Sequence, residues 1–556
     1  MRTRGARPLV MAGAIALVSA VAGLAVRPAA GAEAFDHGAA RRRAIRSACA
    51  LAPEQLRRIE DGIRADRSGE IQVVPAEPDY LDGGLMHAGP WDYLQEVPVL
   101  WYGPGFVRDA GRVDRRVTVA DIAPTQAALL GFDGFDAPDG STMTEALPFD
   151  AGEDPPKLLV TLVWDAAGRN VLTRWPDSWP TLAGLVEDGT WYERAEVGSS
   201  PSNTPPIHAS IGTGAFPDHH GIVDVFMRVG DGPLIQPMNL GPGNLLEPTL
   251  ADVYDRALGN EPVVGAVATL SGHLGFLGHG SMWGGGDKDV AVTRELIDAA
   301  VGGSEGPQWN LAPSMARWYR FPAYVLDVGG YGADVDAVDR SDGEFDRAWH
   351  GDPFTQLNAG FDSPARIPYQ TRVIQQVLRR EGFGRDRVPD LLFLNYKAMD
   401  RVGHLFSVDS PQMRETLEAQ DEYLRVLIDE LDRTVGEGDW AMVITADHGH
   451  QFDPEVSGAF RISISTTQDL LEERFDDGDD VKLFDKVKPT QVWLDESELQ
   501  RNGHPLLELN DALLSLTQAQ TAASPELVHD PDALALAAAF PTDLLDELPC
   551  APEGDA

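Results

Sequence analysis

The chain has 556 residues, more than a single hydrophobic core usually holds, although α/β enzymes with insertions often fill such a length as one elaborated domain. It carries 87 Asp and Glu against 45 Lys and Arg, a formal charge of −42. This excess of negative charge argues against a groove that tracks the phosphates of a nucleic acid polymer. A small anionic substrate would need locally placed cations, metal ions above all. The composition leaves the oligomeric state open.

Residues 1–32 have the pattern of a secretory signal peptide. Three arginines precede an apolar stretch over residues 8–26, and Ala30-Gly31-Ala32 matches the small residues before a cleavage site. No later segment approaches the roughly 20 apolar residues of a membrane span. We therefore expect an exported protein, cleaved near Ala32, without a stable membrane span. An uncleaved anchor is the alternative.

The chain has two cysteines, Cys49 and Cys550, one near each end of the mature sequence. In an oxidising compartment they could form a single disulfide. Pairing requires the two ends to be spatial neighbours, so two free thiols remain the alternative.

Strand-like and helix-like segments alternate along most of the chain, which predicts an α/β fold: a mostly parallel central sheet with helices on both faces. The apolar runs typical of strands lie at 97–102, 158–164, 262–268, 323–328, 391–396 and 440–446. The clearest helix covers 410–435, with Pro411 in its first turn and one apolar stripe. Residues 132–156 are acidic and rich in Gly and Pro, typical of a linker, and 300–370 have the composition of a polar insertion.

Two carboxylate–imidazole pairs follow predicted strands. Asp447-His448-Gly449 ends the apolar run 440–446, and Gly449 permits a sharp bend there. Asp400 and His404 follow the run 391–396 and are one helical turn apart, so both can face one point. Open α/β sheets bind ligands at the carboxyl ends of their strands, and carboxylate with imidazole suits zinc or a similar divalent ion. Two pairs predict two metal ions.

Between the runs 158–164 and 262–268 lie Ser202-Asn-Thr-Pro-Pro-Ile-His208 and Pro217-Asp-His-His-Gly-Ile222. An aspartate at the first strand end, a Thr-x-Pro before a helix, Asp-x-x-Gly-His and Ala-Asp-His-Gly occur here in an order that resembles the alkaline phosphatase superfamily. The most similar branch is the nucleotide pyrophosphatase/phosphodiesterase group. The resemblance covers most of residues 157–450.

The resemblance implies the roles of individual residues. One zinc would be held by Asp165, Asp447 and His448 together with the alkoxide of Thr204, the expected nucleophile. The other would be held by Asp400 and His404. Metal coordination is one way to activate a hydroxyl, which is a poor nucleophile at neutral pH. A helix cap is the alternative role for Thr204.

Members of the family supply one more histidine to the second zinc, usually well after the Asp-His-Gly. In this chain the segment that matches lies upstream: the residues from His87 to Gly105 resemble the closing segment of the family, which carries that histidine. We therefore expect a circular permutant in which residues 33–131 complete the catalytic core, 132–156 join the old ends, and 157–550 form the main domain. His87 would be the missing ligand. An unrelated small domain with a surface His87 is the alternative.

Substrate recognition departs from the family pattern. The asparagine that usually follows His-Gly-Ile in phosphodiesterase members is replaced by Asp224-Val225. We expect Lys288, Asn203 and His273 to contact the substrate, although an ion pair is an equal alternative for Lys288, and core packing for His273. The leading hypothesis is an exported two-zinc hydrolase of a phosphodiester or nucleotide-like substrate, acting through a phospho-threonine. A phosphomonoesterase, a sulfate or phosphonate ester hydrolase, and a zinc-holding binding protein without turnover are the alternatives.

Overall fold

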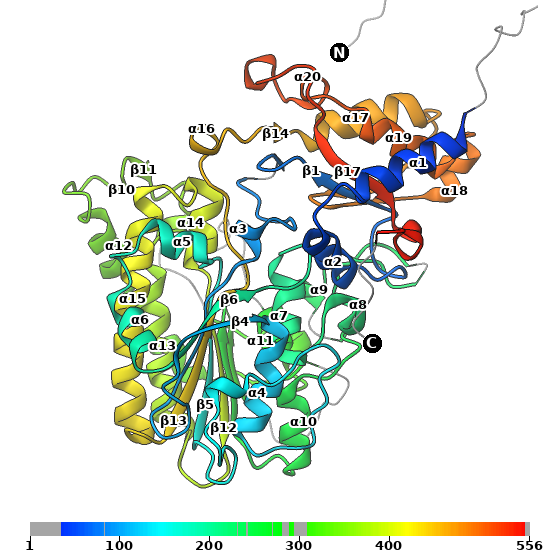
Figure 1. The fold of residues 1–556 in the computed structure, drawn as a ribbon. Helices are drawn as coiled ribbons and strands as arrows, with labels where there is room; N and C mark the ends of the chain where they lie inside the picture. The colour runs from blue at the N-terminus through cyan, green and yellow to red at the C-terminus, as the bar shows by residue number, and fades with distance from the viewer. Residues whose placement is uncertain are drawn as a thin grey trace, which may run out of the picture.

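A nine-stranded sheet forms the centre of the protein in a computed structural model that describes residues 35–550 apart from 83, 231, 241–242, 270, 281–288 and 294–308 (Figure 1). Its strand order is β4-β6-β3-β13-β5-β12-β7-β8-β9. Only β3 is antiparallel to its neighbours, β13 and β6. The strands are β3 (Val99–Tyr102), β4 (Gly111–Thr118), β5 (Leu158–Trp164), β6 (Thr190–Glu196), β7 (Val264–Ala268), β8 (Asp289–Thr293), β9 (Tyr319–Arg320), β12 (Asp390–Tyr396) and β13 (Trp440–Thr445). The predicted α/β fold with a mostly parallel sheet is confirmed.

The three middle strands position the residues of interest. β5, β12 and β13 are continuous apolar runs whose residues are all buried, as expected for strands covered on both faces. Leu158 of β5 pairs with Asp390 of β12 and with Trp440 of β13, so the three strands start level. Their carboxyl ends consequently lie at one edge of the sheet.

Helices cover both faces of this sheet (Figure 1). One face carries α6 (Pro180–Glu187), α13 (Arg366–Glu381) and α15 (Pro411–Leu431). The other carries α4 (Ile122–Leu129), α7 (Thr204–Thr213), α10 (Leu250–Ala257) and α11 (Ser271–Leu277). The predicted helix at 410–435 is α15: the Ser410 hydroxyl caps it by accepting from the Met413 N–H at 3.0 Å.

A second, smaller sheet combines strands from both ends of the chain, an arrangement that the sequence analysis did not anticipate. Its order is β15-β16-β1-β17, so β1, from the start of the chain, lies between two strands from its end. We call this sheet with its helices the accessory lobe. Its elements are α1 (His37–Ala48), β1 (Ile71–Pro75), α17 (Ile464–Phe475), β15 (Phe484–Lys488), β16 (Gln491–Leu494), α18 (Glu496–Arg501), α19 (Leu506–Leu514) and β17 (Leu536–Pro541). Cys49 and Cys550 form a disulfide at its edge, with Cα atoms 5.7 Å apart.

Two segments differ in local structure from what the sequence predicted. Residues 323–328, expected to be a strand, form a 3-10 helix (Ala323–Asp327) after Pro322, whose missing N–H weakens a strand at that point. The segment 132–156 lies against the core, with Met143 and Ala146 fully buried. The remaining elements are α2 (Pro53–Gly62), β2 (Tyr80–Leu81), α3 (Asp92–Gln95), α5 (Arg169–Arg174), α8 (Pro217–His220), α9 (Pro237–Leu240), α12 (Tyr331–Asp339), β10 (Ala348–Trp349), β11 (Asp352–Pro353), α14 (Ala398–Phe406), α16 (Pro454–Ser457), β14 (Arg461–Ile462) and α20 (Gln518–Thr521).

Within the described ranges, each helix is either too short or too polar to cross a bilayer. The predicted signal peptide, residues 1–32, lies outside the described residues.

Candidate functional site

Two carboxylates and an imidazole meet where β5 and β13 end. Asp165 directly follows β5, and Asp447 and His448 follow β13. The His448 Nε2 atom lies 3.3 Å from Asp447 Oδ2 and 3.8 Å from Asp165 Oδ1, and all three residues are buried. The Ala166 N–H fixes Asp447 by donating to its Oδ1 at 2.9 Å. These three side chains can therefore share one ion, and we call them the first cluster.

Gly449, which completes the Asp-His-Gly motif, serves a close approach of two segments. A Cβ at this position would lie 2.1 Å from the carbonyl oxygen of Tyr93, and the Gly449 N–H donates to Leu94 O at 2.8 Å. Its backbone does not adopt a left-handed conformation, so the sharp bend expected at Gly449 is not the reason for the glycine. The residue instead lets the loop after β13 pack on α3.

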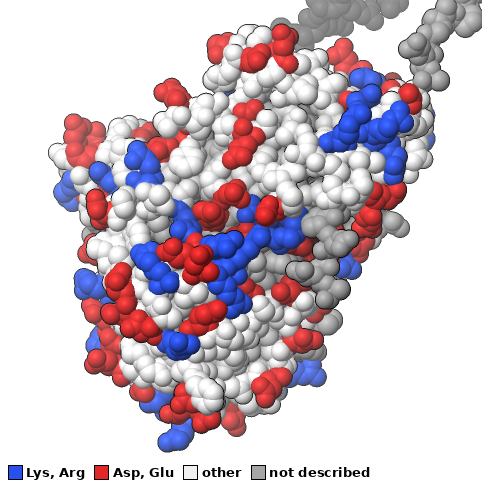
Figure 2. Space-filling view, in the orientation of Figure 1, with Lys and Arg blue, Asp and Glu red and all other residues white. Residues whose placement is uncertain are grey.

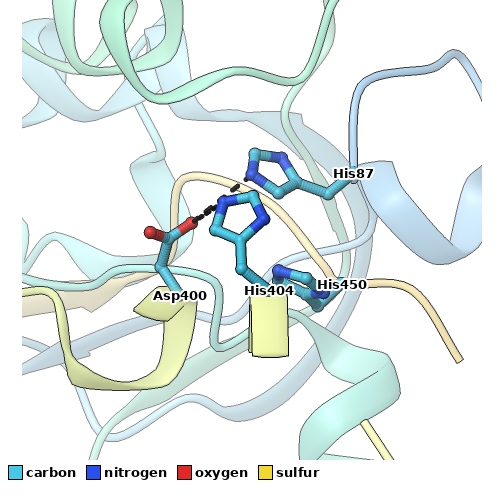
Figure 3. Close-up of side chains that lie close together, drawn as sticks. All are labelled: His87, Asp400, His404 and His450. Atoms are coloured by element: carbon cyan, nitrogen blue, oxygen red, sulfur yellow. Dashed lines mark ion pairs between the residues drawn. The ribbon is translucent and has the colours of Figure 1, made fainter. Parts of the chain in front are cut away.

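The second cluster consists of Asp400, His404 and His87. Asp400 and His404 lie one turn apart on α14, and the Nε2 atoms of His404 and His87 both lie 3.4 Å from Asp400 Oδ1. Figure 3 shows the two rings directed at the same carboxylate oxygen. His87 comes from the segment between β2 and α3, far upstream in the sequence. The structure thus brings it to the residues with which it was expected to bind an ion.

Hydrogen bonds hold the His87 segment to both neighbours. The His87 Nδ1–H donates to Ser202 O at 3.1 Å, and the Ser202 hydroxyl donates back to His87 O at 2.6 Å. Similarly, the Leu85 N–H donates to His404 O at 3.2 Å, and His404 Nδ1–H donates to Leu85 O at 3.2 Å. The segment therefore connects the second cluster to the loop that precedes Thr204.

The hydrogen bonds also set which ring nitrogen of each histidine carries the proton. In His87, His404 and His448, Nδ1 lies 2.8 to 3.2 Å from a backbone carbonyl oxygen, to which it donates. A neutral imidazole that donates at Nδ1 has its lone pair on Nε2. All three Nε2 lone pairs therefore face carboxylate oxygens, which is unfavourable unless a cation lies between them. This arrangement of second partners is common for histidine ligands of metals.

The carboxylates present matching free oxygens. Asp400 Oδ1 and Asp447 Oδ2 are buried and have no hydrogen-bond partner within the described part of the chain. An unpaired buried carboxylate oxygen is costly, and a divalent ion would satisfy it. Because each of these oxygens faces imidazole lone pairs, the donor sets of both clusters fit zinc or a similar ion.

Thr204 and an unexpected lysine lie between the two clusters. Thr204 is the first residue of α7, with its Oγ1 3.5 Å from His448 Nε2. The Lys397 Nζ lies 2.8 Å from Asp165 Oδ1, 3.0 Å from Asp400 Oδ2 and 3.0 Å from Thr204 Oγ1. Sequence reasoning missed Lys397 because it looked like the polar end of β12. Its position one helical turn before Asp400 was the available signal.

The charges in this pocket do not balance. Among the described residues, three buried carboxylates, those of Asp165, Asp400 and Asp447, lie near one buried ammonium, that of Lys397. Burial opposes ionisation of Asp400, but the Lys397 ammonium holds its pKa well below the usual value. Burial and the neighbouring Asp165 instead raise the pKa of Asp447. Added positive charge would relieve this imbalance, because an incompletely paired buried charge is strongly destabilising.

Of the three residues predicted to contact the substrate, Asn203 and His273 are buried and Lys288 is not described. Asn203 precedes Thr204, and its amide donates to the buried Asp224 carboxylate at 2.7 Å. His273 is buried against His208, with ring centroids 4.6 Å apart. His208 in turn lies next to the first cluster, with its Nδ1 3.5 Å from Asp447 Oδ2. Lys288 lies outside the described residues.

Another buried group of acids and a histidine, apart from these clusters, is an internal ion pair. His279 Nε2 lies 2.9 Å from Asp289 Oδ2, and its Nδ1 lies 3.4 Å from Asp252 Oδ1. Burial opposes protonation, but these two carboxylates raise the pKa of His279 to about 10. The imidazolium therefore holds the carboxylates together without a metal.

Basic side chains gather in a streak across the middle of the face in Figure 2, where β4 and β6 lie in Figure 1. A hollow of about 260 Å³ there is lined by Arg58, Arg116 and several acids. Arg58 lies 2.5 Å from Glu196 and 2.6 Å from Asp92, and Arg116 lies 2.6 Å from Glu196. Arg58 and Arg116 therefore belong to an ion-pair network.

Comparison with curated proteins gives relatives with low identity. Alkaline phosphatase PafA from Elizabethkingia meningoseptica is 22% identical over 56% of this chain and 62% of its own length. Alkaline phosphatase PhoD from Zymomonas mobilis is 29% identical over 61% of this chain and 62% of its own. The chain thus spans about three fifths of the length of these relatives.

Solved structures give a similar result. The crystal structure of wild-type alkaline phosphatase PafA matches with 16% identity and a TM-score of 0.47, over 69% of this chain and 84% of that one. Phosphonoacetate hydrolase from Sinorhizobium meliloti matches with 19% identity and a TM-score of 0.32, over 57% and 62%.

The model of one protein family, described as type I phosphodiesterase / nucleotide pyrophosphatase, matches residues 159–534, which is more than half of the chain. The match includes Asp165, Thr204, Asp400, His404 and the Asp447-His448 pair, so it spans both clusters except for His87. The chain therefore belongs to the type I phosphodiesterase / nucleotide pyrophosphatase family.

Proposed function

We propose that this protein is a phosphoric ester hydrolase that binds two divalent ions, zinc by donor chemistry, and uses Thr204 as its nucleophile. The observation that carries the proposal is the position of the Thr204 hydroxyl. Its Oγ1 lies 3.5 Å from Nε2 of His448 in the first cluster and 3.0 Å from Nζ of Lys397, which also contacts Asp400 of the second.

Asp165, Asp447, His448 and Thr204 would hold one ion, and Asp400, His404 and His87 the other. Such ions supply positive charge that favours the Thr204 alkoxide and offsets the charge of the phosphoryl group and the leaving oxygen. Thr204 attacks phosphorus, and the bond to the leaving oxygen on the opposite side breaks. Water then attacks the phospho-threonine, which restores Thr204 and gives net retention at phosphorus.

Lys397 has a part in the same proposal. Its ammonium touches the nucleophile and bridges carboxylates of both clusters, so it lies where the phosphoryl oxygens must enter. A lysine there provides the local cation that an acidic protein needs to attract an anionic ester. The Asn203 amide, which was expected to contact the substrate, donates to Asp224 instead, and the Lys397 ammonium would take over that contact with the substrate.

The leading substrate class is a phosphodiester or nucleotide-like ester. A phosphomonoester is the second candidate, because the Lys397 ammonium suits the additional negative charge of a monoester and because two relatives are named alkaline phosphatases. Sulfate or phosphonate esters, and binding without turnover, stay as alternatives that the experiment below separates.

We also propose that the chain is a circular permutant and is exported. Support for permutation comes from β3, which pairs with β13 in the middle of the main sheet, and from His87, which lies 3.4 Å from Asp400. The Cys49–Cys550 disulfide supports an oxidising compartment.

A substrate panel with metal analysis tests the proposal. Bis-aryl phosphate, aryl phosphate, an aryl phosphonate and aryl sulfate are compared with and without chelator, and metal content is measured in parallel. Thr204→Ala should lower turnover by three orders of magnitude or more, on the order of the loss when a nucleophile is removed, while retaining bound metal. His87→Ala should lose about one equivalent of metal.

Two outcomes would contradict these assignments. Retained activity in Thr204→Ala would eliminate the nucleophile, and two full equivalents of metal in active His87→Ala would remove His87 from the site. Bound zinc without hydrolysis of any ester would favour the binding protein.

A further inference from the structure

His450 lies beside the second cluster although no role has been assigned to it. It follows His448 by two residues in the loop after β13 and is fully buried. A ring nitrogen of His450 lies within 4.8 Å of ligand atoms of His87, Asp400 and His404. Figure 3 shows its ring next to that of His404.

His450 differs from the three other histidines in its proton. Its Nδ1 accepts a hydrogen bond from the Gln451 N–H at 2.8 Å, so this nitrogen must be unprotonated. The ring proton of His450 is therefore on Nε2. His87, His404 and His448 have the opposite arrangement and offer a lone pair at Nε2. Of these four rings, His450 alone presents an N–H, and an N–H cannot bind a metal.

The Nε2–H of His450 is buried and has no acceptor within the described part of the chain. Leaving such a donor unsatisfied is unfavourable. The position of the ring is nevertheless well defined by its surroundings. A Cβ on Gly403 would lie 2.6 to 2.8 Å from atoms of the His450 ring, so the glycine before His404 provides the space that the ring occupies.

The leaving oxygen of an ester is an acceptor of the kind that the His450 N–H lacks among the described residues. Asp400 Oδ1, the nearby free carboxylate oxygen, already faces the lone pairs of His87 and His404. In a displacement by Thr204 at phosphorus, the leaving oxygen lies on the side away from Thr204. Thr204 belongs with the first cluster, so the leaving oxygen lies on the side of the second, beside His450.

We propose that His450 donates a hydrogen bond from Nε2–H to the leaving oxygen of the ester and is not a metal ligand. The proposal rests on the proposed ester hydrolysis. As Thr204 Oγ bonds to phosphorus and the bond to the leaving oxygen breaks, negative charge develops on that oxygen. A fixed donor stabilises this charge, and the proton stays on His450.

A matched pair of variants tests the role. His450→Met has a side chain of similar size without a donor, and His450→Gln places an amide N–H near the position of Nε2. Both are assayed with aryl and alkyl phosphate esters that span a range of leaving-group pKa values. Zinc affinity is measured by chelator competition, zinc content by elemental analysis, and folding by thermal unfolding.

We expect His450→Met to bind zinc with wild-type stoichiometry and affinity. Its kcat/KM should fall about a hundredfold or more for poor leaving groups, on the order of the 10²–10³-fold loss expected when one fixed donor to a developing oxyanion is removed, and much less for good ones. The dependence of rate on leaving-group pKa therefore becomes steeper, and His450→Gln should recover most of the loss. A purely structural role would lower the rates of all esters equally.

Loss of one zinc equivalent, or a hundredfold weaker zinc affinity, in both variants would overturn the proposal in favour of a ligand role. An unchanged leaving-group dependence in an active, zinc-loaded His450→Met would overturn it as well. If the wild-type protein hydrolyses no ester, the proposed ester hydrolysis is wrong, and the proposed role of His450 is wrong with it. If His450→Met does not fold, His450→Gln decides by its zinc affinity and leaving-group dependence, which must both remain near those of the wild type.

Discussion

Asp224 offers a sharp test of the electrostatics beside Thr204. The carboxylate is fully buried, and its Oδ1 accepts from the Asn203 amide at 2.7 Å and the Val225 N–H at 2.5 Å. Burial raises the pKa of Asp224 to about 7, against the opposing effect of these two hydrogen bonds and the attraction of Lys488. Asp224→Asn removes the charge but leaves an oxygen that can accept both bonds.

The magnitude follows from the difference between the folded and unfolded pKa values of Asp224. The folded value of about 7 exceeds the unfolded value of 3.8. Folding therefore favours the protonated carboxyl, and the stability from this group is present below about pH 4 and is lost as the pH rises through 7. A shift of about three units, at 1.36 kcal/mol per unit, corresponds to about 4 kcal/mol at pH 8. At pH 5 the difference is below about 2 kcal/mol.

The assay is urea unfolding of wild type and Asp224→Asn at pH 5 and pH 8, with chelator present so that metal binding does not contribute. Asp224→Asn should be the more stable protein at pH 8, by up to about 4 kcal/mol, and the gain should shrink at pH 5. An equal difference at both pH values, or a less stable variant at pH 8, would refute the reasoning. Either result would mean that Asp224 ionises without cost, with Lys488 as its effective counter-ion.

Two further predictions concern Lys397 and the disulfide. Lys397→Met leaves three buried carboxylates without their cation, so the free energy of unfolding in chelator should fall by about 3–5 kcal/mol. The loss should be clearly smaller with zinc bound. Equal losses of unfolding free energy with and without zinc, measured by calorimetry, would show that Lys397 does not neutralise the clusters. The double variant Cys49→Ala, Cys550→Ala should lower the free energy of unfolding by about 2–5 kcal/mol in urea titration without changing metal content. Unchanged stability under oxidising conditions would mean that the two thiols are not paired in solution.

The sequence was sufficient to predict the middle of the fold and most of the residues that meet in the candidate site. β5, β12 and β13 are long apolar runs, and their buried position follows directly from that pattern. Because parallel strands end at one edge, Asp165 and Asp447 could be expected to meet. His87 was found by similarity of its surroundings to a known pattern, since nothing in its own spacing connects it to Asp400.

What the sequence did not reveal depends on contacts between distant segments. Lys397 reads as an ordinary strand end until its ammonium is seen beside Thr204, and the proton position of His450 depends on one backbone hydrogen bond. The accessory lobe escaped notice because β1 is short and its partners are more than 400 residues away. Residues 323–328 have the apolar content of a strand but follow a proline in a region of short, irregular elements.

The place of β1 between β16 and β17 has a consequence for the order of events during synthesis. A ribosome releases β1 early, but both hydrogen-bonding neighbours of that strand belong to the last part of the chain. His87 follows the end of β1 by 12 residues, so its anchoring strand has no sheet to join until translation is nearly finished. The segment that carries His87 therefore gains the support of this sheet only after β16 and β17 are made, and loss of β17 should impair a candidate site built mostly from residues that remain.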